Sequence, residues 1–136
     1  MQTMAAFLAL NGVLVVLVSS AAGILLYLNL VRGEDPHDWH LLHAGGTARG
    51  VFLIGLGGTI NITGLQDSAA TLSAWLVVVF VWASTIAMVL RGITGETGFG
   101  LSGGPANRIG FILYGIGVLS LFPGLIILAW GFAKSL

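Results

Sequence analysis

The sequence contains no cysteine. This excludes disulfides, iron–sulfur clusters, thiolate zinc sites and haem attached covalently through a Cys-x-x-Cys-His motif. Charged residues are scarce, at 7% of 136 residues, against roughly 25% in an average soluble domain. The formal net charge is zero, and no basic run supports a nucleic-acid partner. We therefore expect no nucleic acid, and any metal must be bound through histidine, methionine, carboxylate or a non-covalent cofactor.

Hydrophobic residues make up 57% of the sequence. A membrane-spanning helix needs a predominantly apolar stretch of roughly 20 residues. Four stretches qualify: residues 4–31, 40–63, 68–90 and 108–133. The first two connections are short, so neighbouring helices are expected to be antiparallel. The sequence predicts an all-α integral membrane protein, a four-helix up-down bundle that forms one domain over residues 1–136, with the lipid bilayer as its surroundings.

The few charges give an orientation. Arg32, Arg91 and Arg108 fall in the first and third connections, and Lys134 lies at the opposite side. The positive-inside rule then places both termini outside the cytoplasm, and we expect a multi-pass protein of the bacterial inner membrane. Four aromatic residues near the span ends are interpreted as interfacial anchors: Tyr27, Trp39, Trp75 and Trp130.

Glycine is concentrated in the last third of the chain. The connection over residues 92–107 carries six glycines, and it is interpreted either as a lid over a site or as a mobile surface loop. In the fourth span, glycine recurs every seventh residue and leaves a bare stripe. The stripe consists of Gly110, Gly117, Gly124 and Gly131. Helix packing is the usual role of such a stripe, and contact with a flat cofactor is the alternative. Pro123 is expected to kink this helix.

Three histidines, His37, His40 and His43, are the only imidazoles of the chain. The last two begin a seam of small or polar residues at heptad spacing along the second span, which we expect to face protein, cofactor or a cavity. The seam comprises His40, His43, Thr47, Gly50, Ile54, Gly57 and Asn61. Polar groups inside a bilayer are costly and by default mark a functional site.

A haem is the cofactor that these histidines fit best. Zinc or di-iron sites need carboxylates from other spans, and those spans contain none. One neutral imidazole is enough for a haem. Two histidines of one helix cannot reach opposite faces of a porphyrin, so the iron is expected to be five-coordinate or capped weakly by Met88. His43 could also be a packing histidine, and His37 and His40 lie at the watery end of the helix.

Arg49 is the most unusual charge. It follows His43 by six residues, or about 9 Å along a helix, which places it near mid-membrane. An arginine there must pair with an anion or reach water. The candidates are a haem propionate, an anionic or oxygen-rich ligand, and backbone carbonyls of another chain. A helix that starts at a different residue would also change the depth of Arg49.

The pattern Trp39-x3-His43-x-Gly45-x2-Ala48-x-Gly50, preceded by Asn29-Leu30-Val31-x-Gly33, resembles the membrane-bound styrene oxide isomerases. The resemblance implies a four-helix protomer, a homotrimer, and haem b held between subunits by one histidine, which here is His43. It also implies that ferric haem acts as a Lewis acid on a small apolar epoxide. The ring opens toward a carbocation, and a hydride shift gives the aldehyde.

The chain departs from this family on the substrate side. Arg49 stands where the family has an asparagine, while Phe80 and Met88 lie near its aspartate and tyrosine. The family also has a histidine in its first span, which this chain lacks, and Asn11 lies near that position. The working hypothesis makes His43 the iron ligand, with Gly46, Thr47 and Gly50 lining the haem. Arg49 would anchor a propionate or orient substrate, and Phe80 and Met88 would line the pocket.

Two rivals to an isomerase stay open. One is a non-enzymatic haem protein for electron transfer or sensing, whose sixth iron position is filled by Met88 or by a neighbouring chain. The other is a cofactor-free structural subunit of a larger membrane complex.

Overall fold

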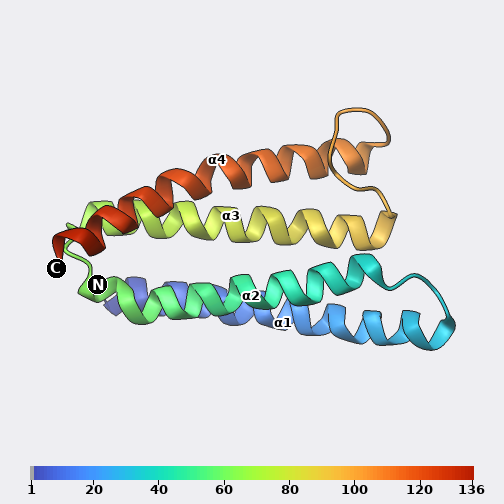
Figure 1. Ribbon diagram of the computed structural model, residues 1–136, viewed down its shortest axis with the longest axis horizontal. Coiled ribbons are helices and arrows are strands. Elements are labelled where there is room, and N and C mark those ends of the chain that lie inside the picture. The colour runs from blue at the N-terminus through green and yellow to red at the C-terminus, as the bar shows by residue number, and fades with distance from the viewer. Residues whose placement is uncertain (1) are drawn as a thin grey trace.

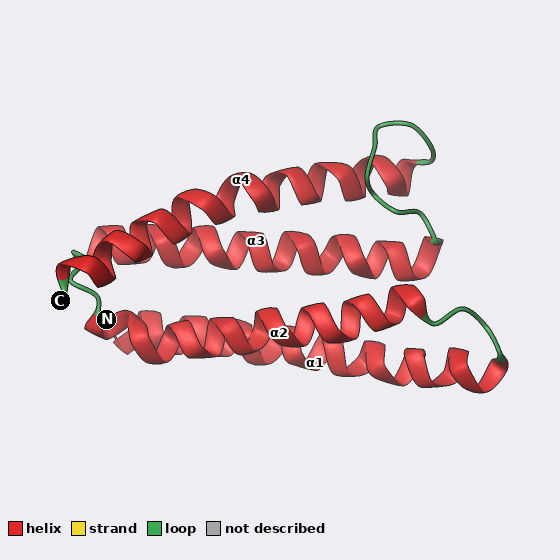
Figure 2. Ribbon diagram, viewed as in Figure 1, coloured by secondary structure: helices red, strands yellow, loops and turns green. Residues whose placement is uncertain are grey.

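The computed structural model describes residues 2–136, and over this range the chain forms four α-helices and no strand. They are α1 (Gln2–Arg32), α2 (His37–Thr59), α3 (Asp67–Thr94) and α4 (Pro105–Lys134). A short 3-10 helix, η1 (Ile60–Ile62), follows α2. The chain direction reverses at each connection, and both termini lie at the same end (Figure 1). Helices account for nearly all of the molecule (Figure 2), as expected for an all-α fold.

Glycine and proline set the helix ends. Gly33 and Gly95 follow α1 and α3 with φ of 70° and 71°, a left-handed conformation that glycine adopts without a steric penalty. Pro105 begins α4, where its missing N–H is not needed. The predicted connection over residues 92–107 is therefore too long. Because α3 continues until Gly95, the connection covers only residues 95–104.

Three helices, α1, α3 and α4, are long and apolar enough to cross a membrane, so the chain is a multi-pass membrane protein. The sequence predicted a fourth span over residues 40–63. Its α2 counterpart is helical but does not reach the same apolarity within the described residues. The reason is local, because α2 contains all three histidines, Asp38 and Arg49.

The helices pair as two hairpins. α1 packs mainly on α2 and α3 mainly on α4, while α2 and α3 join the hairpins. In the first hairpin the backbones approach closely at glycines. A Cβ added to Gly50 would lie 2.7 Å from the carbonyl oxygen of Gly12, and one added to Gly57 would lie 2.8 Å from that of Ala5. Small residues of this kind are the usual means by which membrane helices pack.

The glycine stripe of α4 serves the second hairpin. Gly117 lies against Phe80, and Gly124 lies against Val77. All four stripe glycines are buried. Helix packing accounts for Gly117 and Gly124, whereas Gly110 lies against Gly98 and Gly131 against Leu65, both in connections. α4 runs through Pro123 without a break in its helical assignment.

The apolar core occupies the half of the bundle nearest the termini, with Leu8, Leu53, Val77 and Leu128 among its buried members. The other half, toward the connections after α1 and α3, contains the polar residues of interest. Large apolar side chains cover the outside, as with Leu119, which is 78% exposed. This outer surface suits lipid.

The aromatic anchors divide into two groups. Tyr27, Trp75 and Trp130 are exposed, as expected of residues that meet the membrane interface. Trp39 is half-buried, and its role as an anchor stays a prediction. Its ring packs closely on α3, where a Cβ at Gly92 would lie 2.9 Å from it.

The close approach of α1 and α2 gives a test. Gly57→Val should destabilise the protein by about 1–3 kcal/mol, because its side chain meets the backbone of α1. Gly58→Val is the matched control, since a Cβ there has nothing within 4 Å. Thermal unfolding in a mild detergent measures both. Equal unfolding temperatures of the two variants would contradict the packing described here.

Candidate functional site

His43 is held by a hydrogen bond to α1. Its Nδ1 lies 2.8 Å from the carbonyl oxygen of Ser19. A carbonyl oxygen only accepts hydrogen bonds, so Nδ1 carries the proton and donates it. In the neutral ring, Nε2 then keeps its lone pair. This is the arrangement in which metal-binding histidines are usually found, with one ring nitrogen oriented by a backbone carbonyl and the other free for the metal.

Two small residues make this position possible. A Cβ at Gly23, on α1, would lie 2.9 Å from Nδ1 of His43 and 3.0 Å from its Cε1. A Cβ at Gly46, one turn along α2, would overlap the hydroxyl of Ser19. Any larger residue at either place pushes the imidazole or the helix away. The sequence pattern therefore permits the hydrogen bond that fixes the ring.

The seam around His43 is only partly covered. Gly50 and Gly57 are buried against α1, His43 and Thr47 are half-buried, and His40 is exposed. Ile54 and Asn61 of the same seam are also exposed. The expectation that the whole seam faces protein or cofactor therefore holds within one chain only for part of its length. Thr47 donates its hydroxyl to the carbonyl of His43 at 2.6 Å.

Arg49 lies on a different face of α2 from His43. It follows His43 by six positions, which places the two side chains about 120° apart around the helix axis. Its Nη2 donates to the thioether sulfur of Met88 on α3 at 2.9 Å, and its buried Nε has no partner among the described residues. A thioether is a weak acceptor, and an arginine at mid-membrane costs at least about 3 kcal/mol. The guanidinium is thus poorly satisfied by the chain itself.

A second arginine, Arg91 near the end of α3, forms an ion pair. Its Nε donates to Oδ1 of Asp38 in the first turn of α2 at 2.5 Å, with the two side chains 16% and 25% exposed. The pair ties α2 to α3 close to the place where Trp39 packs on Gly92. Asp38 is therefore not available to Arg49.

The glycine-rich connection is folded onto α4. Its Phe99 ring stacks on Tyr114, with centroids 5.4 Å apart. Asn107 holds the backbone by accepting from the N–H of Gly98 at 2.7 Å and donating to the carbonyl of Gly100 at 2.8 Å. These contacts fold the segment back onto Tyr114 of α4, and its role as a lid over a site stays a prediction.

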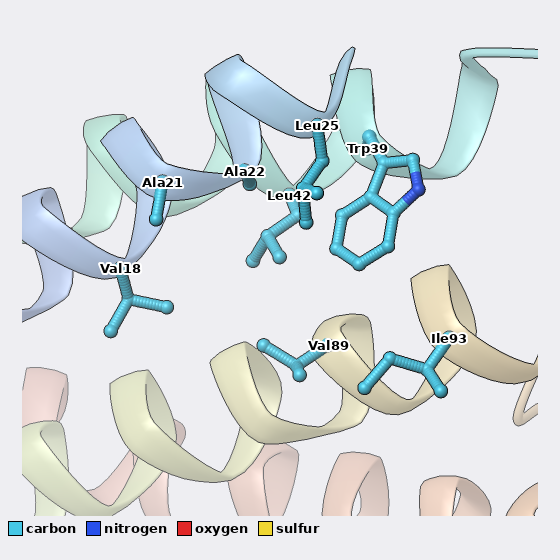
Figure 3. A pocket seen from close by; sticks show the side chains of 8 residues that line it. All are labelled: Val18, Ala21, Ala22, Leu25, Trp39, Leu42, Val89 and Ile93. Atoms are coloured by element: carbon cyan, nitrogen blue, oxygen red, sulfur yellow. The ribbon is translucent and has the colours of Figure 1, made fainter. Parts of the chain in front are cut away.

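An apolar pocket of about 420 Å³ lies between the first hairpin and α3. Trp39 and Leu42 face Val89 and Ile93 across it, and α1 supplies the rest of the wall (Figure 3). The volume falls in the range of small-molecule sites. Leu42 directly precedes His43, so the pocket borders the helical turn that carries the imidazole.

The predicted site residues are thus only partly brought together. Arg49 and Met88 are in contact. Phe80 lies eight residues before Met88 and packs on Gly117 of α4, so one chain does not assemble the three into one pocket. Gly46 and Gly50 face α1. Their small size is used for helix packing there.

A comparison with models of protein families identifies the family of this chain. Residues 4–133 match the family model described as styrene oxide isomerase. The chain belongs to the styrene oxide isomerase family. A comparison with individual curated proteins found no match. The resemblance based on the tryptophan-to-histidine block is confirmed, and it extends over nearly the whole chain.

Sequence reasoning missed several members of this site. Ser19 and Gly23, which position His43, were not proposed. The sequence contained a signal for Ser19 and Gly23. Gly12, Ser19 and Gly23 are small residues at spacings of seven and four, which places them on one face of α1.

The contact of Gly23 with the imidazole predicts the effect of one methyl group. Gly23→Ala should push the ring of His43 away from Ser19 and weaken its preference for the Nδ1–H tautomer. Nitrogen NMR of ¹⁵N-histidine-labelled protein in detergent measures this preference, with Gly55→Ala as the control in open space. A His43 signal that stays the same in Gly23→Ala would show that the hydrogen bond does not fix the ring.

Proposed function

We propose that this protein is a membrane-bound isomerase that binds haem b and rearranges a small apolar epoxide to a carbonyl compound. Family membership supports the isomerase class. The observation that carries the haem assignment is the hydrogen bond from Nδ1 of His43 to Ser19, because it leaves Nε2 as a neutral ligand atom. When bound, haem b supplies a ferric iron that acts as a Lewis acid on the epoxide oxygen.

The residues present fit such a group. Haem needs one axial protein ligand, and within residues 2–136 no set of three or more histidine or carboxylate side chains is placed for a multi-ligand metal site. Gly23 leaves the room that the imidazole occupies against α1. His43 would hold the iron, and Thr47, bonded to the carbonyl of His43, would lie next to the porphyrin.

The chain's own residues would then shape the reaction. The apolar pocket beside α2 would accept a small apolar molecule and exclude water. Arg49 and Met88 form the polar part of the site, on the face of α2 toward α3. Arg49 would anchor a propionate or orient the substrate. Phe80 would enter the site only through a neighbouring subunit or a movement of α3.

The assembly completes the proposal. The four helices would cross the bilayer as an up-down bundle, with both termini outside the cytoplasm of a bacterial inner membrane. Three protomers would associate, since His40 and the open part of the seam beside His43 are exposed in a single chain. A neighbouring copy would cover that face and enclose the haem.

The electron-transfer alternative has less support. A six-coordinate haem of this kind needs a second strong ligand, and Met88 is the candidate within the chain. Its sulfur accepts a hydrogen bond from Arg49 between α2 and α3, whereas His43 faces α1. The two residues therefore do not face a common space from opposite sides.

The visible spectrum of the purified protein tests the proposal. Wild-type protein made with adequate haem supply should show a Soret band, which His43→Ala should lose or shift. His37→Ala is the control, because His37 is exposed at the first residue of the same helix and should keep the band. Gas chromatography with small aryl epoxides should then show a carbonyl product. A colourless wild type would contradict the haem assignment, and a coloured but inactive protein would contradict the isomerase.

A further inference from the structure

Arg49 carries a positive charge that the protein does not neutralise. Its Nε is buried and has no partner among the described residues, and Nη2 is bonded only to the thioether of Met88. Gly45 leaves the space beside the guanidinium, since a Cβ there would lie 3.4 Å from Nη2. A guanidinium offers five donors in a planar fork, and most of this capacity is unused.

The chain has no acidic residue to offer at this depth. Its five carboxylates all lie at helix ends or in connections: Glu34, Asp35, Asp38, Asp67 and Glu96. Asp38 is taken by Arg91. Glu96, in the connection between α3 and α4, accepts from the backbone N–H of Asn107 at 2.5 Å. The counter-charge of Arg49 must therefore come from outside the chain.

The surroundings define the chemistry of that partner. The planar fork of an arginine matches a carboxylate, with which it forms two parallel hydrogen bonds. The thioether of Met88, which contacts the guanidinium, gives the neighbourhood an apolar character. A compact ligand with one carboxylate and an apolar body suits both features.

We infer that Arg49 binds a carboxylate, presented beside Met88 between α2 and α3. The carboxylate belongs either to a substrate-sized apolar acid or to a propionate of the haem. The inference deepens the proposed function and rests on it for the assignment of Arg49 to the substrate side. It extends the accepted ligands from neutral epoxides to molecules that carry a carboxylate.

Benzoate is the probe for the first source, with benzamide as its uncharged counterpart. Benzoate should raise the unfolding temperature of the purified full-length protein in non-ionic detergent by at least about 3 °C near saturation, and benzamide should not. Arg49→Met should weaken benzoate binding at least about tenfold. Without ligand, Arg49→Met should be at least as stable as wild type, because it removes an unpaired buried charge. A purely structural arginine would give the opposite change in stability.

Two further variants serve as controls for this test. Arg108→Met removes an exposed arginine at the start of α4 and should retain the full benzoate response. Arg49→Lys keeps the charge and loses the fork, so it should respond to benzoate more weakly than wild type. It also serves if Arg49→Met fails to fold.

Haem dimethyl ester is the probe for the second source. If a propionate occupies the site, wild type should bind the ester at least about tenfold more weakly than haem, and Arg49→Met should lose the difference. No benzoate response together with equal binding of haem and its ester would overturn the inference. Haem ligation by His43 is read separately from the visible spectrum, so failure here is distinguishable from failure of the proposed function.

Discussion

The hydrogen bond between His43 and the backbone of Ser19 determines what the rest of the site can do. It decides which nitrogen of the imidazole is free, and it forms only because α1 and α2 approach closely. The contact of Gly23 with the ring and the close fit at Gly12 and Gly50 belong to the same interface. Helix packing and ligand orientation are therefore one constraint. A substitution that separates the hairpin also misdirects the ring.

The two halves of the bundle differ in polarity. Leu8, Leu53 and Val77 fill the half near the termini with apolar side chains, which needs no polar partners. The other half contains polar groups in pairs, His43 with Ser19 and Arg91 with Asp38. A further pair, Asn11 with the indole N–H of Trp82 at 2.8 Å, lies against the apolar core. Nε of Arg49 and Oγ1 of Thr85 are the exceptions, since both are buried without a partner among the described residues. In a membrane environment an unpaired charge points to a ligand.

Much of the fold could be predicted from sequence, because apolar run length and the glycines and proline at helix ends are local signals. Gly33, Gly95 and Pro105 end or begin helices by their own backbone preferences. Tertiary contacts leave no such local signal. The position of Trp39 at a span end could be predicted, but its packing on Gly92 could not. His43 was identified from its type and position, but its partner is a backbone carbonyl, which leaves no side-chain signal in the sequence.

Resonance Raman spectroscopy of the reduced, haem-loaded protein tests the central claim most directly, which is that Nε2 of His43 is the protein ligand of the iron. The account predicts an iron–imidazole stretching mode that shifts when histidine is labelled with ¹⁵N and that is absent in His43→Ala. A protein that binds haem without a histidine-sensitive mode, or that keeps the mode in His43→Ala, would contradict the account.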